Sequence, residues 1–499
     1  MLIIINYIQT KKNVLLSVVQ VLISGLSLLL IYKYLLIIIG VKFLGVWSIV
    51  MAASSIVRAS DLGFSSGMVK FVAKYKAHER IDKISSLIQT SIISVSIFLG
   101  GIALGLFLIL NKLIHLIVPD YHYINEATKL MPYVIVSFVI MGISSVFLSS
   151  IDGIQRIDIR NLITIAGTLI YTVAIIILVH FYGFIGLGYA QITQSLFMLI
   201  ISWYYTHRLL QLPLKLPHLW NYQDFKEMFS YNAYIQLNSI VVLLLDPVTK
   251  ILLSRYGGLE FVTYYEMANR LVMQVRAIIV NANQVLVPVI ADINEKNQQM
   301  IVDLYYNTYA FIVFISTAAY TLLAIATPVI GQLWIGHFQP LFVHITYIVI
   351  VALALNTLIG PAYFTNLGTG NVIDNTASQI LIGLSNIILG LIGGLLWGGY
   401  GVVVGYALAI IIGSAYLIKR FIRRHGMGYV SLFSGNFVYV FSAIATILIA
   451  TLIGEDHQIL ALCLSGGMFL LILSRHPMMS SILKNIRSKH SNKNLREFF

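Results

Sequence analysis

Charged and hydroxyl side chains recur at helical spacing inside otherwise apolar stretches of this chain. One such stripe consists of Ser54, Arg58, Asp61 and Ser65. Spacings of four, three and four residues place these side chains on one face of a helix. A cation at the centre of a membrane-spanning helix costs ~2.5–3.5 kcal/mol, so it usually faces a partner or a water-filled cavity. Two interpretations are open: Arg58 and Asp61 line a cavity that accepts an anionic group, or they pair and extend toward the membrane surface.

A second polar stripe lies between residues 229 and 254. Asp246 and Lys250 stand four residues apart, in the order that favours an ion pair along a helix. Pro247 follows the carboxylate and should kink or loosen the helix at that point. A kink beside a carboxylate suits a moving gate or a protonation switch. The alternative is a neutralised pair near the end of the helix.

The most polar stripe lies between residues 263 and 287. Glu266 and Arg270 form another pair at the i, i+4 spacing, and Gln274 and Asn281 continue the same face. We interpret this face as one that lines a polar cavity. The local pairing of Glu266 with Arg270 also allows a purely structural role for that arginine.

The first half of the chain recurs in outline about 217 residues later. Residues 40–47 match 258–265, Arg58 matches Arg276, 116–122 match 333–339, Tyr182-Gly183 matches Tyr400-Gly401, and 188–190 match 405–407. Matches in one order and at nearly constant spacing indicate an internal duplication. Duplicated membrane proteins are commonly transporters whose site lies between the two halves.

Arg58 and Arg276 are the intramembrane cations that recur in both halves. Arg276 has no acidic neighbour on its own helix, so it is available for another anion. A guanidinium group offers parallel N–H donors that match phosphate oxygens. The two arginines, related by the repeat, would therefore suit a diphosphate. Contact with phospholipid headgroups at the helix ends is the competing interpretation.

Composition restricts the class of protein. Of the 499 residues 59% are hydrophobic and only 10% are charged, against about 25% charged in soluble proteins. The apolar runs are about 20 residues long and continuous rather than alternating, which predicts helices and excludes a β-barrel.

The basic excess of 32 Lys and Arg over 19 Asp and Glu lies in short loops, so we expect no nucleic-acid partner. The lone Cys463 cannot form an intramolecular disulfide.

We therefore predict an all-α polytopic membrane protein. Hydropathy indicates about fourteen membrane spans, near 14–39, 43–69, 84–110, 130–151, 161–181, 185–206, 229–254, 263–287, 305–328, 342–365, 376–397, 401–418, 434–453 and 459–473. The repeat groups the first twelve into two six-helix units of the same orientation. Most loop cations lie on one face, which places both termini in the cytoplasm.

This organisation predicts three regions: an N-lobe at 1–206, a C-lobe at 207–425, and a further span pair with a basic tail at 426–499. No cofactor is expected, because the chain has no nucleotide-binding glycine loop. The histidines lie at span ends without ligand spacing, so no metal site is expected. No Ser/His/Asp set and no paired catalytic carboxylates are present, so we expect a protein that is not an enzyme.

Several motifs together resemble Wzx-type polysaccharide flippases. The residues that carry the resemblance are 40–47, Ser60-Asp-Leu-Gly-Phe64, Lys70-Phe-Val-Ala-Lys-Tyr75, Gly153-Ile-Gln-Arg-Ile157 and 250–265. The resemblance extends over about residues 14–425. One departure concerns Lys250: members of that family often carry an acidic residue directly before it, whereas this chain has Thr249, with Asp246 one turn earlier.

The resemblance implies membership of the superfamily that also contains multidrug/toxin (MATE) exporters and lipid II flippases. It implies two six-helix lobes arranged as a V that opens to either side in turn. It also implies a polyprenyl-diphosphate-linked oligosaccharide, such as an O-antigen unit, moved across the bacterial cytoplasmic membrane. Membrane lipid, a polysaccharide polymerase and a chain-length regulator are the partners implied.

On this interpretation the substrate-binding cations are Arg58, Arg276, Arg270 and Lys250, and the polar or coupling residues are Asp61, Asp246, Glu266, Ser54, Gln274 and Asn281. A multidrug exporter is the first alternative, but cationic drugs favour a cavity dominated by carboxylates. A membrane-embedded polysaccharide polymerase is the second, and it would be expected to carry a sizeable outer loop. A lipid II flippase is the third, although the arginine-rich first span expected of one is absent.

Overall fold

The computed structural model describes residues 2–54, 64–109, 114–115, 121–211, 220–284, 290–291, 293–294 and 299–428. Throughout these residues the regular structure is helical, which confirms the all-α prediction. The chain divides into two compact units, one of residues 1–263 with 390–402 and the other of 264–389 with 403–499. The three-region division drawn from the repeat stays a prediction.

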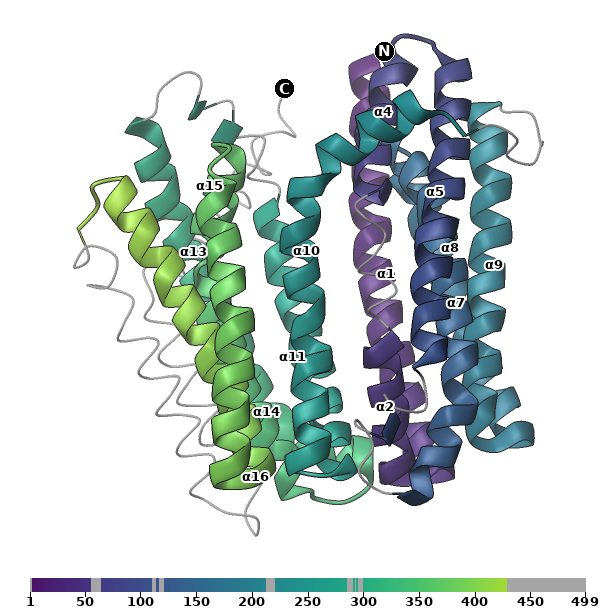
Figure 1. The fold of residues 1–499 in the computed structure, drawn as a ribbon. Coiled ribbons are helices and arrows are strands. Elements are labelled where there is room, and N and C mark those ends of the chain that lie inside the picture. Colours follow the sequence, from purple (N-terminus) through teal and green to yellow (C-terminus); the bar gives the residue numbers. More distant parts are fainter. Residues whose placement is uncertain are drawn as a thin grey trace, which may run out of the picture. The chain divides into compact units, whose positions relative to one another are not determined.

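The first unit is built mainly from long helices that run side by side (Figure 1). In chain order these are α1 (Leu2–Ile38), α2 (Gly40–Ser54), α4 (Phe64–Ala77), α5 (Ile81–Leu108), α7 (Tyr121–Gly153), α8 (Ile157–Tyr182), α9 (Gly186–Leu210) and α10 (Tyr222–Tyr256). Helix α7 is central, since it packs against α2, α4, α5 and α9, while α1 packs against α8. Helix α10 contacts α2, α4 and α5.

The second unit contains most of α11 (Leu259–Gln284), together with α13 (Gln299–Ile335), α14 (Pro340–Leu358), α15 (Gly360–Gly368) and the two arms of α16 (Val372–Arg424). Part of its core is aromatic: Tyr305 and Tyr309 of α13 stack on each other, and Phe421 of α16 packs against Tyr305. This cluster joins the ends of α13, α15 and α16.

Helices that are long and apolar enough to cross a bilayer account for much of the described chain, as predicted. Among them are two segments, Ile157–Leu210 of 54 residues and Val372–Arg424 of 53 residues. A turn interrupts each segment, at Gly183 between α8 and α9 and at Trp397 and Gly398 within α16. Each therefore supplies two of the predicted spans. The predicted pair 434–453 and 459–473 lies outside the described residues.

The backbone repeats at the start of each half. Gly40 is the first residue of α2 and Gly258 directly precedes α11, and both glycines adopt a φ of +80°. This is a left-handed conformation that side chains other than that of glycine rarely adopt. The two positions are 218 residues apart, so the predicted match of 40–47 with 258–265 extends to the backbone geometry.

Later in the repeat the predicted register is wrong. The predicted partner of Gly183 is Gly401, but the glycine with its conformation is Gly398: φ and ψ are 58° and −140° at Gly183, and 60° and −141° at Gly398. The offset is thus 215 residues. It also relates Gly186, which lies against the Leu178 carbonyl, to Gly401, which lies against the Gly393 carbonyl. The two Tyr-Gly dipeptides are identical in sequence, but the residue that corresponds structurally to Gly183 is the glycine that has a positive φ in the turn.

Candidate functional site: polar side chains of α10 and α11

The predicted ion pair on α10 is present. Lys250 Nζ lies 2.7 Å from Asp246 Oδ2, and only 2% of the lysine side chain is exposed, against 39% of the aspartate. Helix α10 continues through Pro247, and Thr249 donates its hydroxyl to the Leu245 carbonyl. A buried ammonium is costly unless it is paired, so Asp246 holds the charge of Lys250 inside the first unit.

The predicted pair on α11 is also present. Arg270 Nε donates to Glu266 Oε1 at 2.8 Å, with the carboxylate buried and the guanidinium half-exposed. Gln274 is half-buried in the next turn, and Asn281 lies near the end of the same helix. The i, i+4 spacing thus corresponds to two ion pairs, one in each unit.

Arg276 takes part in a hydrogen-bonded chain across three helices of the second unit. Its Nη2 donates to Asn356 Oδ1 of α14 at 2.8 Å, and Asn356 Nδ2 donates to Ser414 Oγ of α16 at 3.0 Å. The acceptor of the arginine is thus a neutral amide, so the guanidinium charge is not cancelled by this contact. Asn356 and Ser414 were missed from the sequence, because they lie 80 and 138 positions away from Arg276.

A polar stripe on α11 surrounds this arginine. Asn269, Arg276 and Asn283 are spaced seven residues apart, and each has a buried polar atom: Asn269 Oδ1, Arg276 Nε and Asn283 Nδ2. None of the three atoms finds a hydrogen-bond partner among the described residues. Buried polar groups in native proteins are nearly always satisfied by protein, water or ligand. The stripe therefore has buried polar atoms whose hydrogen bonds the described residues do not supply.

The predicted site residues of the second span are only partly described. Ser54 ends α2 and is fully buried. Arg58 and Asp61 lie outside the described residues, so the pairing of Arg58 with Arg276 across the repeat stays a prediction. No group of three or more His, Cys, Asp or Glu side chains that could hold a metal ion occurs in the described part of the chain.

Two buried carboxylates at helix starts were also missed. Asp158, at the start of α8, lies 3.0 Å from both Lys12 and Arg156, and its side chain is fully buried. In the second unit Asp374, at the start of α16, pairs with Arg420 at 3.3 Å and Arg424 at 2.8 Å. The distribution of such loop and helix-end cations predicts the orientation of the chain in the membrane. Four of them, Lys12, Arg156, Arg420 and Arg424, also form ion pairs at the starts of helices.

Solved structures of similar fold are transporters. A lipid II flippase, MurJ in an inward-closed conformation, has a TM-score of 0.72 at 14% identity, covering 93% of this chain and 98% of the flippase. An inward-facing MATE multidrug-resistance transporter of the MOP superfamily has a TM-score of 0.70 at 15% identity, covering 81% and 94%. A MOP-superfamily transporter from Pyrococcus furiosus gives 0.56 at 14%, covering 82% and 95%. These likenesses establish the fold.

Sequence comparison supplies the family. No curated protein matches the chain closely enough to count as a relative. A family model described as polysaccharide biosynthesis protein matches residues 10–294, which is more than half of the chain. That stretch includes most of α1, the helices from α2 to α10 and the polar stripe of α11. This match shows that the chain belongs to the polysaccharide biosynthesis protein family.

Proposed function

We propose that this protein is a flippase for a polyprenyl-diphosphate-linked oligosaccharide, such as an O-antigen or other polysaccharide repeat unit. Flipping moves the diphosphate and sugars from the cytoplasmic to the outer leaflet while the lipid tail stays in the bilayer. The observation that carries this proposal is the match to the polysaccharide biosynthesis family over residues 10–294. The similarity to a lipid II flippase supports a fold able to move a lipid-linked glycan.

The chemistry of the second unit supports an anionic, oxygen-rich substrate. Arg276 keeps its charge while Asn356 holds one of its nitrogens, so the guanidinium is oriented rather than neutralised. The amides of Asn269 and Asn283 can donate to and accept from sugar hydroxyls. We assign diphosphate binding to Arg276 and Arg58. Arg270 with Glu266 and Lys250 with Asp246 are the paired charges that we also assign to substrate binding and coupling.

A multidrug exporter is the closest rival, because MATE transporters share the fold. Cationic drugs need carboxylates that are free of protein cations. In the described part of the chain, Asp246 and Glu266 are each bonded to a cation. This arrangement favours an anionic substrate.

The remaining features of the proposal follow from the loop charges and the family. We place the protein in the bacterial cytoplasmic membrane, with both termini in the cytoplasm. Transport occurs by alternating access, in which an N-lobe at 1–206 and a C-lobe at 207–425 open to either side of the membrane in turn. No covalent bond is made or broken. A polysaccharide polymerase and a chain-length regulator would use the flipped product.

The test is transport in proteoliposomes that contain the purified full-length protein. A fluorescent polyprenyl-diphosphate oligosaccharide is placed in the membrane, and its appearance in the opposite leaflet is followed with a membrane-impermeant quencher. Arg276→Ala should lower the rate, whereas Arg208→Ala, an exposed cation at the end of α9, should not. Efflux of a cationic dye by the wild type, with no glycolipid movement, would reverse the assignment in favour of the drug exporter.

A further inference from the structure

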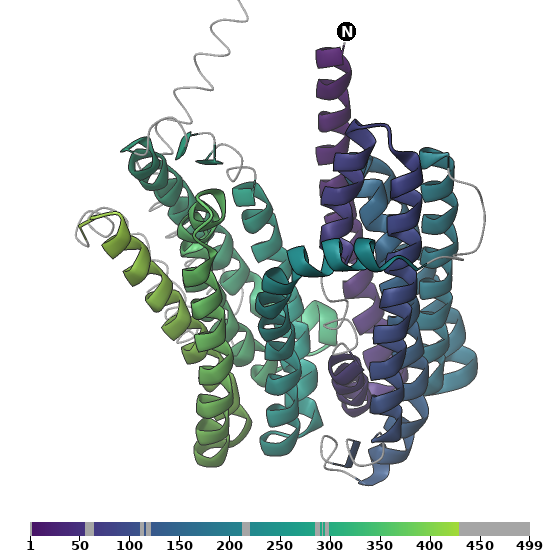
Figure 2. The same ribbon diagram turned by 45° about the horizontal axis from the view of Figure 1, so that its top comes forward.

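The segment before the seventh predicted span forms a distinct structural element. We define the strap as Trp220–Phe229, which contains the first turns of α10. Figure 2 shows these turns of α10, in teal, lying across the direction of the purple and blue helices of the first unit before α10 changes direction. The strap touches α4 and α5, so it is held by helices far earlier in the chain.

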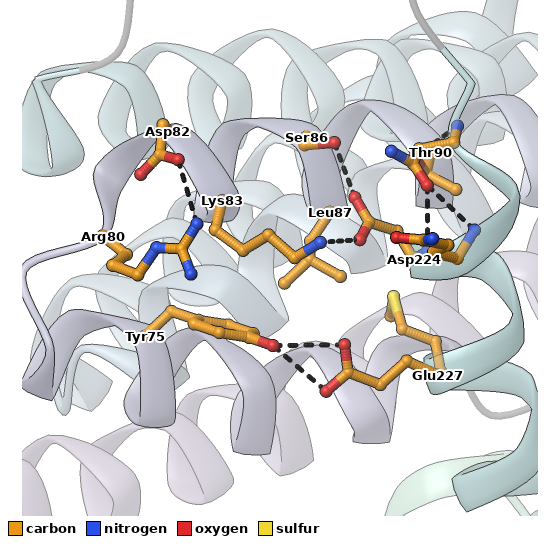
Figure 3. A network of polar contacts seen from close by, with 12 residues as sticks. Tyr75, Arg80, Asp82, Lys83, Ser86, Leu87, Thr90, Asp224 and Glu227 are labelled. Carbon is orange, nitrogen blue, oxygen red and sulfur yellow. Dashed lines mark hydrogen bonds and ion pairs between the residues drawn. The ribbon is translucent and has the colours of Figure 1, made fainter.

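One face of the strap is acidic and docked. The Asp224 carboxylate is fully buried, where it pairs with Lys83 and accepts from Ser86 Oγ at 2.6 Å (Figure 3). One turn later both carboxylate oxygens of Glu227 accept from Tyr75 Oη at 3.1 Å, and Lys74 Nζ lies 3.3 Å away. The hydrogen bond to Glu227 raises the pKa of Lys74, so this lysine stays charged at physiological pH.

The start of the strap is fixed by neutral hydrogen bonds. Asn221 caps α10, because its side-chain oxygen accepts from the backbone N–H groups of Gln223 and Asp224. Its own backbone N–H donates to Thr90 Oγ1 at 3.2 Å, and the indole of Trp220 donates to Ser94 Oγ at 3.0 Å. The polar atoms of the strap therefore point toward α5.

The opposite face of the strap is aromatic and exposed. Tyr222 is 62% exposed, Trp220 is 47% exposed and Phe229 is 39% exposed. Phe225 stacks on Phe229 with ring centroids 5.5 Å apart, and the Trp220 ring lies 5.6 Å from that of Phe225. Lys226 is exposed, and its helical spacing from Tyr222 and Phe229 places it on the same face. The strap thus presents an aromatic face that also carries a cation.

This arrangement reverses the usual order of a helix in water, where acids face solvent and aromatic rings face the protein. Burying the Asp224 carboxylate and half-burying that of Glu227 while exposing the rings of Trp220, Tyr222 and Phe229 is favourable only if the surroundings of the outer face are themselves partly apolar. Tryptophan and tyrosine rings with a neighbouring lysine are characteristic of the membrane–water interface.

The depth of the strap agrees with that environment. Helix α5 has 28 residues and is therefore about 42 Å long. Centred on a ~30 Å hydrocarbon core, it would extend about 6 Å, or four residues, beyond each boundary. Ser86, the sixth residue of α5, accordingly lies close to the boundary, and the strap is bonded to it.

We propose that the strap is an interfacial membrane-docking element whose aromatic face, Trp220, Tyr222, Phe225 and Phe229, lies in the headgroup region of the leaflet at the N-terminal end of α5. Lys226, together with the exposed Lys70 and Lys76 of α4, makes anionic phospholipid headgroups the preferred partner. The docked acids hold the strap on the first unit, so the start of α10 stays attached to both that unit and the leaflet surface.

The test uses the full-length protein in vesicles of phosphatidylethanolamine and phosphatidylglycerol. The only cysteine is removed by Cys463→Ser, and an environment-sensitive fluorophore is attached at Tyr222→Cys or, separately, at Phe229→Cys. The control label is at His78→Cys, an exposed position in the turn between α4 and α5. We expect labels at 222 and 229 to emit at shorter wavelength than the control. Lipids spin-labelled near the headgroup should quench them several-fold more strongly.

Two outcomes would overturn the proposal. Quenching of the strap labels by aqueous iodide to the same extent as the control would place the aromatic face in water. Insensitivity to lipid quencher together with energy transfer between labelled copies would show that a second copy covers the face. The anionic preference is tested separately, because Lys226→Gln should weaken lipid quenching in vesicles of phosphatidylglycerol more than in those of phosphatidylcholine alone.

Discussion

Arg276 and Asn356 are joined by a 2.8 Å hydrogen bond from the guanidinium Nη2 to the amide Oδ1, and the same amide donates to Ser414. Because the Asn356 nitrogen donates to Ser414, the oxygen end of the amide faces the arginine and accepts from it. The amide therefore fixes the orientation of the guanidinium without neutralising it. A carboxylate at the same position would orient the guanidinium and also neutralise its charge.

This relationship predicts the effect of Asn356→Asp. The new carboxylate should form an ion pair with Arg276 and compete with the substrate diphosphate for the guanidinium. We expect glycolipid transport to fall by about tenfold or more, equivalent to ~1.4 kcal/mol, with no loss of thermal stability. Transport in proteoliposomes and a thermal unfolding curve of the same preparation measure the two effects.

Arg276→Lys is a second prediction about the same group. Lysine keeps the charge but lacks the planar fork that binds two phosphate oxygens at once. We expect transport between the wild-type and Arg276→Ala levels. Equal transport by Arg276→Lys and the wild type would indicate that charge alone matters at this position. Equal transport by all three would remove Arg276 from the site.

A third prediction concerns the strap, whose acid Asp224 is bonded to Lys83. Removing one partner of a buried ion pair costs on the order of 3–5 kcal/mol, and partial exposure of Lys83 puts the cost at the lower end. Lys83→Met should therefore release the strap, and limited proteolysis should cut the chain near residues 211–222 faster. Adding Asp224→Asn removes the uncompensated charge, so the double variant should be cut more slowly than Lys83→Met. Additive effects of the two substitutions would contradict direct coupling.

Local interactions were the ones that could be predicted from the sequence. The pairs Asp246–Lys250 and Glu266–Arg270 follow from helical spacing alone, and the structure contains both. The contacts of Arg276 were not predictable, because Asn356 and Ser414 belong to helices whose packing no short-range pattern specifies. The strap was missed for a similar reason. In the sequence, Asp224 and Glu227 look like ordinary charged residues of a loop. Their partners, Lys83 and Tyr75, lie about 140 to 150 residues earlier and come close only in the folded chain.

The repeat shows the same limit in the backbone. Gly40 and Gly258 were matched because the residues around them are alike, and they share a φ of +80°. The match of Gly183 to Gly401 failed because it rested on a shared Tyr-Gly dipeptide and not on the geometry of the turn. The property that the turn requires, a positive φ, belongs to Gly398. Sequence similarity located the duplication, but backbone conformation determines which residues of the two halves correspond.

The last prediction uses this corrected register. Gly186 faces the Leu178 carbonyl and Gly401 faces the Gly393 carbonyl, in turns that the 215-residue offset relates. A Cβ at either position would collide with backbone, which cannot move aside as a flexible side chain could. Gly186→Ala and Gly401→Ala should therefore each lower the unfolding temperature and the yield of folded protein. Gly100→Ala is the matched control, because a Cβ there meets no atom within 4 Å and alanine is favoured over glycine in a helix by about 1 kcal/mol. If Gly401→Ala were as stable as Gly100→Ala, the arms of α16 would be separated further than the shared turn geometry implies.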